Sequence, residues 1–353
     1  LVLRCAGKTF VAGADIKEFG KPMAEPVFPA VLRMMDAATK PIVAAIHGTV
    51  LGGGFELALA AHYRIADTAA RFGFPEVKLG LMPGAGGTQR VPRLAGLQTA
   101  IDLITGGGQI GAATAERAGL IDAVAEGDLA EAAHRFAREI VAGNRGVRRA
   151  GDLPMPADDP ALFDTARQTI ARKQRGQDAP LKALEAIRLG YELPFEEALE
   201  REYALCKALI AGPQSKALRH IFAAEREVAR IPDLPEGTGE RPVHVVGVIG
   251  LGVMGRGIVM ALAAAGLKVM AVGLDQSNLD AAMAAITKMW AGSVAKGSLT
   301  QAAMDERLAL VSGSVDPADL ASADLVIEAV TEDLATKQAV FAALGRVTRA
   351  GTI

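Results

Sequence analysis

Cysteine and aromatic side chains are scarce in this sequence. Its 353 residues include two cysteines, whose spacing fits neither a Cys-x-x-Cys pair nor a Cys/His metal motif, so we expect reduced thiols and no metal site. Aromatic residues make up 4% of a chain that is 50% hydrophobic. This balance favours an α/β enzyme rich in Ala, Val, Leu and Gly, and it argues against an all-β binding module.

Long hydrophobic runs and a net charge of one sign are also missing. The longest nearly pure apolar run, at residues 258–267, falls far short of the roughly 18 to 20 residues that span a bilayer. The formal net charge is −2, with acidic and basic residues interspersed, so no long-range field favours nucleic acid or an anionic membrane. The sequence therefore predicts a soluble protein without nucleic-acid or membrane partners, in which local groups hold any anionic ligand.

The length predicts two or three domains, because 353 residues exceed one typical hydrophobic core. The chain opens on Leu1 without an initiator methionine, and it stops at Ile353 in what reads like an incoming strand. We expect both ends to be truncated, in which case targeting signals would lie outside the sequence.

Residues 40–66 show a strand, a tight turn, a helix and a second strand in succession. Residues 42–46 are rich in β-formers, a glycine cluster follows, residues 55–61 are an apolar helical stretch, and residues 63–66 read as a strand. This order predicts a βαβ unit with a right-handed crossover. A second cluster of glycine and proline within residues 71–94 precedes an amphipathic helix, and functional sites are common in such loop-rich segments.

Two glycines and two glutamates in this region are candidate site residues. Gly53 and Gly54 precede the helix, and a residue without Cβ lets a ligand approach closely enough to bond a peptide N–H. The helix N-terminus adds partial positive charge there, and Glu56 lies beside it. Glu76 follows FGFP (residues 72–75), in a turn that can aim a carboxylate. Taken alone, each of these residues also has a structural explanation. Glutamates at helix starts interact favourably with the helix dipole, and glycines form turns.

Four blocks in this half resemble the crotonase family of enoyl-CoA hydratases and isomerases in order and spacing. They are VAGADIKEF (11–19), PIVAAIHG (41–48), GGGFELA (52–58) and FGFPEVKLGLMPGAGGTQR (72–90). The resemblance implies an α/β fold with a crotonase-like ββα spiral domain over residues 1–145, acyl-CoA as substrate and no cofactor for hydration. It places the oxyanion-binding N–H groups at Ala12 and Gly53, and a substrate-lining segment at Ala12, Gly13, Ala14 and Asp15.

The resemblance also assigns roles to the glutamates. Glu56 would activate water, and Glu76 would deliver a proton to the α-carbon of a trans-2-enoyl-CoA. Many relatives with other reactions lack one of the two acids, so the presence of both favours hydration. Isomerisation of Δ3- to Δ2-enoyl-CoA, with Glu76 shuttling a proton alone, is the alternative on the same site. Two carboxyl groups sharing one desolvated water should not both ionise freely, because the like charge raises one pKa.

A helical linker region follows the crotonase-like part. Residues 146–240 show helical periodicity rich in Arg, Lys and Glu, broken by prolines at 180, 194 and 213. Residues 232–242 are a flexible connection by composition, because proline and glycine stop both helices and strand ladders. We therefore expect a domain boundary there, with a further domain over residues 241–353.

A glycine-rich turn opens this last domain. Residues 244–249 are a continuous, largely β-branched run, which predicts a buried strand, and Gly250, Gly252 and Gly255 follow before a helix that Gly266 caps. In this context Gly-x-Gly-x-x-Gly allows a tight turn, a close approach by a pyrophosphate and tight helix packing. The pattern predicts a dinucleotide site.

Further elements of that domain follow from its apolar runs. Strands are expected at 269–272 and 325–329, and a helix is expected over roughly 334–344. An acidic residue that binds the ribose should lie near the end of the second strand, where Asp275 is the candidate.

Residues 241–353 resemble the NAD-binding domain of 3-hydroxyacyl-CoA dehydrogenase, mainly through residues 242–260 and ADLVIEAVTED (323–333). The resemblance implies a partial Rossmann domain with NAD as cofactor. The family's ribose-binding acid aligns with Gly273, two residues before Asp275, which departs from the pattern. The family's catalytic Ser and His/Glu pair would lie past Ile353, so we expect no hydride transfer by these 353 residues. The implied NAD contacts are Met254, Val330, Thr331, Glu332 and Lys337.

The two parts in this order resemble the fused multifunctional enzymes of fatty-acid β-oxidation, including the peroxisomal bifunctional type and its bacterial relatives. The resemblance implies enoyl-CoA hydration and, in the complete protein, NAD-dependent 3-hydroxyacyl-CoA dehydrogenation. A non-catalytic protein that binds nucleotide and acyl-CoA is the alternative from another class. The resemblance is compatible with a monomer or with association with thiolase in the complete protein. It is also compatible with a location in the bacterial cytoplasm or in the peroxisome. Acyl chain length is left open.

Overall fold

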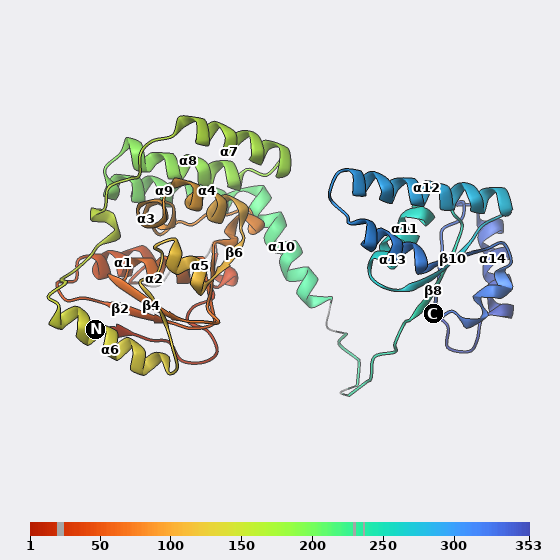
Figure 1. Cartoon of the computed structure of the whole chain (residues 1–353), viewed down its shortest axis with the longest axis horizontal. Helices are drawn as coiled ribbons and strands as arrows, with labels where there is room; N and C mark the ends of the chain where they lie inside the picture. Colours follow the sequence, from red (N-terminus) through yellow and green to blue (C-terminus); the bar gives the residue numbers. More distant parts are fainter. Residues whose placement is uncertain (20–24, 229–230, 236) are drawn as a thin grey trace. The chain divides into compact units, whose positions relative to one another are not determined.

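The computed structural model describes residues 1–19, 25–228, 231–235 and 237–353. These residues form two compact units, Leu1–Pro232 (unit 1) and Asp233–Ile353 (unit 2), as Figure 1 shows. The flexible connection expected at 232–242 begins at their boundary, and its residue 236 lies outside the described part. Among the described helices, none has both the length and the apolar character needed to cross a bilayer.

Unit 1 contains a four-stranded parallel sheet in the order β1-β2-β4-β7. All of β2 is buried, and its alternate side chains serve two layers. Ala44 and Ile46 belong to the main core with α2 (Gly53–Ala60), whereas Val43 and Ala45 pack with α6 (Leu129–Ala142), which lies on the other face of the sheet in Figure 1. The strands are β1 (Val2–Leu3), β2 (Val43–Ile46), β4 (Tyr63–Asp67) and β7 (Ala123–Ala125).

The βαβ unit expected over residues 40–66 is confirmed, because β2 and β4 pair in parallel and α2 lies between them in the chain. The sequence did not indicate β3 (Thr49–Leu51), which pairs with β5 (Arg71–Gly73) in a separate three-stranded sheet that β6 (Gln109–Gly111) completes. The chain leaves β2 at Gly48, where φ is +61° and a Cβ would lie 2.4 Å from the Lys8 carbonyl oxygen. Glycine is therefore required at this turn between the sheets.

Further helices of unit 1 come from both the crotonase-like part and the helical region after it. Each proline that breaks the helical periodicity stands at a helix start, where its missing N–H is tolerated. The helices are α1 (Phe28–Asp36), α3 (Gly87–Ala95), α4 (Leu97–Gly106), α5 (Ala112–Arg117), α7 (Pro160–Lys173), α8 (Ala179–Glu192), α9 (Phe195–Ala211) and α10 (Pro213–Glu227), with short 3-10 turns η1 (Ile16–Glu18), η2 (Pro75–Leu79) and η3 (Ala150–Asp152).

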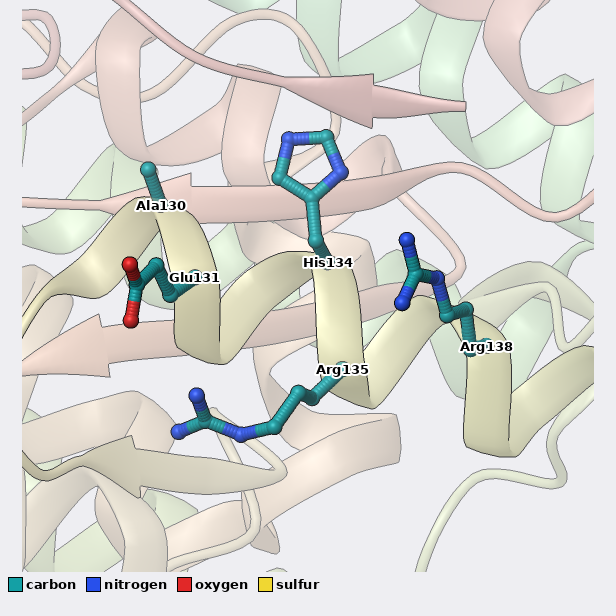
Figure 2. A pocket seen from close by; sticks show the side chains of 5 residues that line it. All are labelled: Ala130, Glu131, His134, Arg135 and Arg138. Carbon is teal, nitrogen blue, oxygen red and sulfur yellow. The ribbon is translucent and has the colours of Figure 1, made fainter.

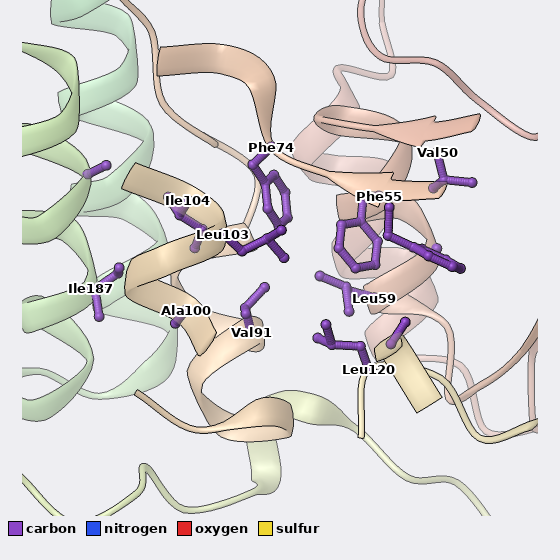
Figure 3. Close-up of a cluster of buried hydrophobic side chains, with 14 of the residues drawn as sticks. Val50, Phe55, Leu59, Phe74, Val91, Ala100, Leu103, Ile104, Leu120 and Ile187 are labelled. Carbon is purple, nitrogen blue, oxygen red and sulfur yellow. The ribbon is translucent and has the colours of Figure 1, made fainter. Parts of the chain in front are cut away.

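One apolar cluster joins these two parts of unit 1. Phe55 of α2 stacks on Phe74 with ring centroids 5.0 Å apart, and both are fully buried. Figure 3 shows Ile104 of α4 and Ile187 of α8 in the same cluster, to which Phe163 of α7 also belongs. The helices after residue 152 therefore share a core with the strand-rich part of unit 1.

Unit 2 is a parallel sheet in the order β10-β9-β8-β11 with helices between its strands. Numbered from the first strand of the unit, this is the order 3-2-1-4 of a Rossmann fold, so the partial Rossmann domain is confirmed. The order reverses between β8 and β11, and ligands of such sheets bind at this switch point, beyond the carboxyl ends of the strands. The elements are β8 (Val245–Ile249), α11 (Val253–Ala264), β9 (Lys268–Val272), α12 (Gln276–Ala295), α13 (Gln301–Ala309), β10 (Val311–Ser314), η4 (Pro317–Ser322), β11 (Leu325–Glu328) and α14 (Leu334–Val347).

Candidate active site

Glu56 lies in the first turn of α2, with its side chain buried at 3% exposure. Its Oε1 accepts hydrogen bonds from the backbone N–H groups of Ala85 (2.7 Å) and Gly87 (2.9 Å). Both donors belong to the second glycine cluster, at the start of α3. The two Gly/Pro-rich segments that the sequence singled out are therefore brought together around this carboxyl group.

Glu76 comes to the same place from η2. A Cβ on Gly52, the residue before α2, would lie 2.7 Å from Glu76 Oε1, and Gly52 has a φ of +54°. A side chain at this position would therefore displace the carboxyl group. Although Glu76 is half-buried as a residue, its Oε2 is enclosed and accepts no hydrogen bond from the described protein groups. That oxygen is available to a ligand or a water.

The segment from Ala12 to Asp15 lies against the start of α2. Val11 bridges to Val50 of β3, and its carbonyl oxygen accepts from Leu51 N at 3.2 Å. A Cβ on Gly54 would be 2.1 Å from that same oxygen, so the approach of the segment depends on a glycine there. The Gly53 Cβ position is 4.0 Å from Ala14 N. The segment is mostly exposed at Ala12, Ala14 and Asp15, as a surface that meets a ligand should be.

Burial raises the pKa of both glutamates above the ordinary value of 4.5, but their surroundings differ. For Glu56 the N–H groups of Gly87 and Ala85 and the charge of Arg90 all lower the pKa again, because they favour the carboxylate. For Glu76 the next largest cause is the charge of Glu56, which raises its pKa further. The pKa of Glu76 therefore stands well above 4.5. Gly52 adjoins both residues, because its carbonyl oxygen accepts from Glu56 N at 2.9 Å and its Cβ position lies 2.7 Å from Glu76 Oε1.

A third buried carboxyl group, Glu202, joins this pair, and the sequence reasoning missed it. Glu202 lies on α9 and has 0% exposure. Its pKa is raised to about 8, mainly by burial and next by the charge of Glu56. Cys206 is one turn further along, and burial followed by the charge of Glu56 raises the pKa of its thiol. The signal was present: Ala198 and Glu202 are spaced by four residues on the buried face of α9.

Gly250, Gly252 and Gly255 form the turn between β8 and α11 in unit 2. Gly250 has a φ of +94°, and a Cβ there would lie 2.7 Å from the carbonyl oxygen of Ala329. A Cβ on Gly255 would lie 1.8 Å from the Gly250 carbonyl oxygen, so the helix can pack here only without a side chain. A Cβ on Gly252 would meet nothing within 4 Å, which leaves the helix N-terminus open to a phosphate group. The turn fits a dinucleotide.

Three residues expected to contact NAD (Val330, Thr331 and Glu332) lie in the loop after β11, and the other two lie on helices. Lys337 is in the first turn of α14, and Met254 is in α11 with 75% exposure. Lys337 Nζ is 2.8 Å from Glu328 Oε2 and 3.4 Å from Glu332 Oε1. Glu328 Oε1 also accepts from Val330 N at 2.6 Å, so this glutamate orders the loop that carries Val330 and Thr331. The sequence reasoning missed Glu328, although an acid as the last residue of a strand at the switch point was a usable signal.

Asp275 is the N-cap of α12, where its Oδ1 accepts from Asn278 N at 2.8 Å. Its carboxylate is thus engaged by the helix, and its other oxygen remains for a ribose hydroxyl. Gly273 directly follows β9, the second strand, and a Cβ there would lie 3.1 Å from Leu279 Cβ. A side chain at position 273, which aligns with the family's ribose-binding acid, would therefore fit only if Leu279 shifts slightly.

The described part of unit 1 includes surface hollows, of which two bear on the search for a site. The larger, of about 390 Å³, runs along α6 and is lined by Ala130, Glu131, His134, Arg135 and Arg138 (Figure 2). It contains none of the candidate residues. The smaller, of about 230 Å³, borders the glutamate site, because Gly84 and Ala85 line it together with Leu32 of α1 and Leu199 of α9.

Comparisons with known proteins agree with this arrangement. Residues 1–152 match the family of enoyl-CoA hydratase/isomerase, and residues 245–353 match the NAD binding domain of 3-hydroxyacyl-CoA dehydrogenase. The peroxisomal bifunctional enzymes of Danio rerio and Homo sapiens are 39% and 38% identical to the chain, in each case over 98% of it. The chain thus carries, in this order, a region of the enoyl-CoA hydratase/isomerase family and an NAD-binding region of the 3-hydroxyacyl-CoA dehydrogenase family.

The two matched ranges confirm the predicted order of a hydratase/isomerase region followed by an NAD-binding dehydrogenase region. A peroxisomal fatty acid β-oxidation multifunctional protein of Arabidopsis thaliana is also similar, at 33% identity over 98% of this chain. The chain spans about half the length of these curated relatives, namely 48% of the Danio rerio, 49% of the Homo sapiens and 50% of the Arabidopsis thaliana protein. Glu202 lies between the two matched ranges.

Proposed function

We propose that unit 1 hydrates trans-2-enoyl-CoA to 3-hydroxyacyl-CoA, with Glu56 as the base and Glu76 as the acid. The observation that carries the proposal is the pair of neighbouring, enclosed carboxyl groups in unlike surroundings. Glu56 is supplied with N–H donors and a nearby guanidinium, so it holds the negative charge. Glu76 has its own backbone N–H to favour the carboxylate, but burial and the charge of Glu56 outweigh that hydrogen bond, so Glu76 holds the proton. One base and one acid then coexist near neutral pH.

The N–H groups of Ala12 and Gly53 are proposed to receive the thioester oxygen. Hydration puts negative charge on this oxygen as water adds to the β-carbon, and preorganised N–H donors stabilise that charge. Gly53 is the first residue of α2, where the helix dipole adds to the effect. Gly13, Ala14 and Asp15 would line the substrate beside them. The proton then passes from Glu76 to the α-carbon, while Glu56 takes one from the water.

Unit 2 is proposed to bind NAD for the dehydrogenation step of the longer protein. The pyrophosphate would lie on the N–H groups at the start of α11, over Gly250, Gly252 and Gly255, and Asp275 would bind a ribose hydroxyl. Met254, Val330, Thr331, Glu332 and Lys337 are the further proposed contacts. When bound, NAD supplies the hydride acceptor for oxidation of the 3-hydroxyacyl product.

The proposed division into domains is residues 1–145, 146–240 and 241–353. The matched ranges of 1–152 and 245–353 support the first and the last of these. An acyl-CoA is the proposed substrate, and the protein would be a monomer or associate with thiolase when complete. The peroxisome is the proposed compartment, supported by the relatives' names, and the bacterial cytoplasm is the alternative.

Mixing the chain with crotonyl-CoA and following the enoyl absorbance tests the hydration proposal. We expect the absorbance to fall to a new equilibrium as the double bond is hydrated. Binding of crotonyl-CoA without any loss of absorbance would instead favour a non-catalytic acyl-CoA-binding protein.

Introducing a carboxylate at position 273 should tighten NAD binding. Gly273→Asp places an acid where the family binds the ribose, and a hydrogen bond to a charged group contributes about 1.5 to 3 kcal/mol, or roughly tenfold or more in affinity. Gly273→Ala is the matched control, because it adds the same Cβ next to Leu279, 3.1 Å from its Cβ, without the carboxylate. Calorimetry with NAD measures both. Equal affinities for the two variants would show that Asp275 already holds the ribose.

A further inference from the structure

Glu202 reaches the hydratase site from a helix outside both matched families. Its Oε1 accepts two hydrogen bonds from Thr88, one from the backbone N–H at 3.0 Å and one from Oγ1 at 2.9 Å. Thr88 is the second residue of α3, and both side chains are fully buried. α9 therefore holds the first turn of α3 through this carboxyl group.

The same turn holds Glu56. Gly87 N donates to Glu56 Oε1 at 2.9 Å, and the next N–H along the chain, that of Thr88, donates to Glu202. The two carboxyl groups are thus bound by consecutive peptide groups at the start of one helix. A Cβ on Gly87 would lie 3.1 Å from Glu56 Oε1 and 2.8 Å from Pro83 Cβ, so the turn has little room to move without disturbing Glu56.

A buried hydrogen-bond network extends from this turn. Gln89 Nε2 donates to Thr88 Oγ1 at 2.9 Å and to the carbonyl oxygen of Ala186 in α8 at 2.7 Å. Arg90 Nη1 donates to the Ala85 carbonyl oxygen at 2.9 Å, and Ala85 is the second N–H donor to Glu56. The donors of Glu56 are therefore held by side chains of α3: Thr88 is anchored on α9 and Gln89 on α8, while Arg90 pairs with Asp36 of α1.

We propose that Glu202 is a positioning residue of the hydratase site, which holds the start of α3 so that its N–H groups stay on Glu56. The inference rests on the proposed hydratase function and extends it to a residue beyond position 152. Four ionisable groups face Glu202: Glu56 of α2, Glu76 of η2, Arg90 of α3 and Cys206 of α9. Burial and the charge of Glu56 raise the pKa of Glu202 to about 8, so at pH 7 it accepts from Thr88 as a neutral acid and adds no second charge beside Glu56.

Two substitutions separate the hydrogen-bonding role of Glu202 from its charge. Glu202→Leu removes the acceptor and leaves both Thr88 donors buried and unpaired, whereas Glu202→Gln keeps an acceptor oxygen and cannot ionise. We expect Glu202→Leu to lower kcat for crotonyl-CoA by about 10- to 100-fold, the scale of a misplaced catalytic group, with little change in KM. Glu202→Gln should recover most of that loss at pH 7. Glu197→Leu, an exposed glutamate on the same helix, is the matched control for both.

The pH dependence of kcat is a second measurement, and it would not change if Glu202 only stabilised the fold. In the wild-type protein the charge of Glu202 raises the pKa of Glu76 once Glu202 ionises. Without that charge, the pKa of Glu76 falls, so the alkaline limb of kcat should move to lower pH in Glu202→Gln while the acid limb stays in place. Glu197→Leu should leave both limbs unchanged.

Three outcomes are decisive. A Glu202→Leu enzyme with wild-type kcat, or a Glu202→Gln enzyme with the wild-type alkaline limb, overturns the positioning role. If Glu202→Leu does not fold, the profile of Glu202→Gln decides alone. A wild-type chain that does not hydrate crotonyl-CoA contradicts the proposed function instead, so the two failures are distinguishable.

Discussion

Glu56→Gln and Glu76→Gln should each lower kcat for crotonyl-CoA hydration by at least about 10²-fold, the usual contribution of one acid or base. Glutamine keeps the shape and the oxygen that accepts from Ala85 and Gly87, so the change removes proton transfer and little else. A 10²-fold loss corresponds to about 2.7 kcal/mol of transition-state stabilisation. The measurement is the initial loss of enoyl absorbance at saturating substrate.

The pH dependence of kcat in the same assay tests the assignment of Glu56 as the base and Glu76 as the acid. The proposed mechanism requires Glu56 ionised and Glu76 protonated, and the pKa of each is raised above 4.5. Activity should therefore fall as pH decreases through the pKa of the Glu56 carboxyl and fall again as pH increases through the higher pKa of Glu76. The two limbs report the coupled pair rather than isolated residues.

Glu126→Gln, which changes an exposed glutamate of unit 1, is the control for these substitutions. Thermal unfolding of all three variants checks that the core is intact. Near-normal turnover by either purified site variant would contradict the assigned roles. Isomerisation of a 3-enoyl-CoA by Glu56→Gln would show that Glu76 alone supports the alternative reaction of this family.

Gly252→Ala should weaken NAD binding by about tenfold or more without lowering the melting temperature of unit 2. The added methyl group would meet no protein atom within 4 Å, and the residue has an ordinary φ of −67°, so the fold tolerates it. It would instead occupy the space that a pyrophosphate needs above the helix N-terminus. Loss of one hydrogen bond to a charged group contributes about 1.5 to 3 kcal/mol, which sets the expected scale.

Substitutions of two glycines within α11 serve as controls for Gly252→Ala. Gly257→Ala also adds a methyl group in open space, but within the helix, so NAD affinity should stay near wild type. Gly255→Ala places a Cβ 1.8 Å from the Gly250 carbonyl oxygen, so it should lower both affinity and melting temperature. Calorimetry with NAD and thermal unfolding give the two readouts. Wild-type NAD affinity in Gly252→Ala would exclude a pyrophosphate at this turn.

The sequence predicted the strands and turns that are determined by residues adjacent in the chain. The strands at β2, β4, β8, β9 and β11 are short runs rich in apolar residues, and each is confirmed to within one or two residues. Their order and the glycine turns predicted a βαβ unit and a dinucleotide site, whereas the crotonase-like and Rossmann domains were implied by the family resemblances. β3 was missed because it has three residues and one buried side chain, too short a pattern to separate from the turn at Gly48.

Tertiary contacts explain what was missed around the site. Glu76 and Glu56 could be proposed from their neighbours in sequence, but the N–H groups of Ala85 and Gly87 become donors only when α3 folds back onto α2. Glu202 is separated from Thr88 by 114 positions, and only the packing of α9 on α3 brings them together. Glu328 likewise acquires its contact with Lys337 through the fold of the loop after β11.

The shared core of unit 1 sets where this protein can be cut or recombined. The hydratase family match ends at residue 152, yet Phe163, Ile170 and Ile187 lie in the same apolar cluster as Phe55. A fragment ending at 152 would expose that cluster and should aggregate, whereas one ending near 232 keeps it covered. Chimeras that exchange the hydratase module between relatives should therefore place their junction at the end of the helices, where the chain itself divides.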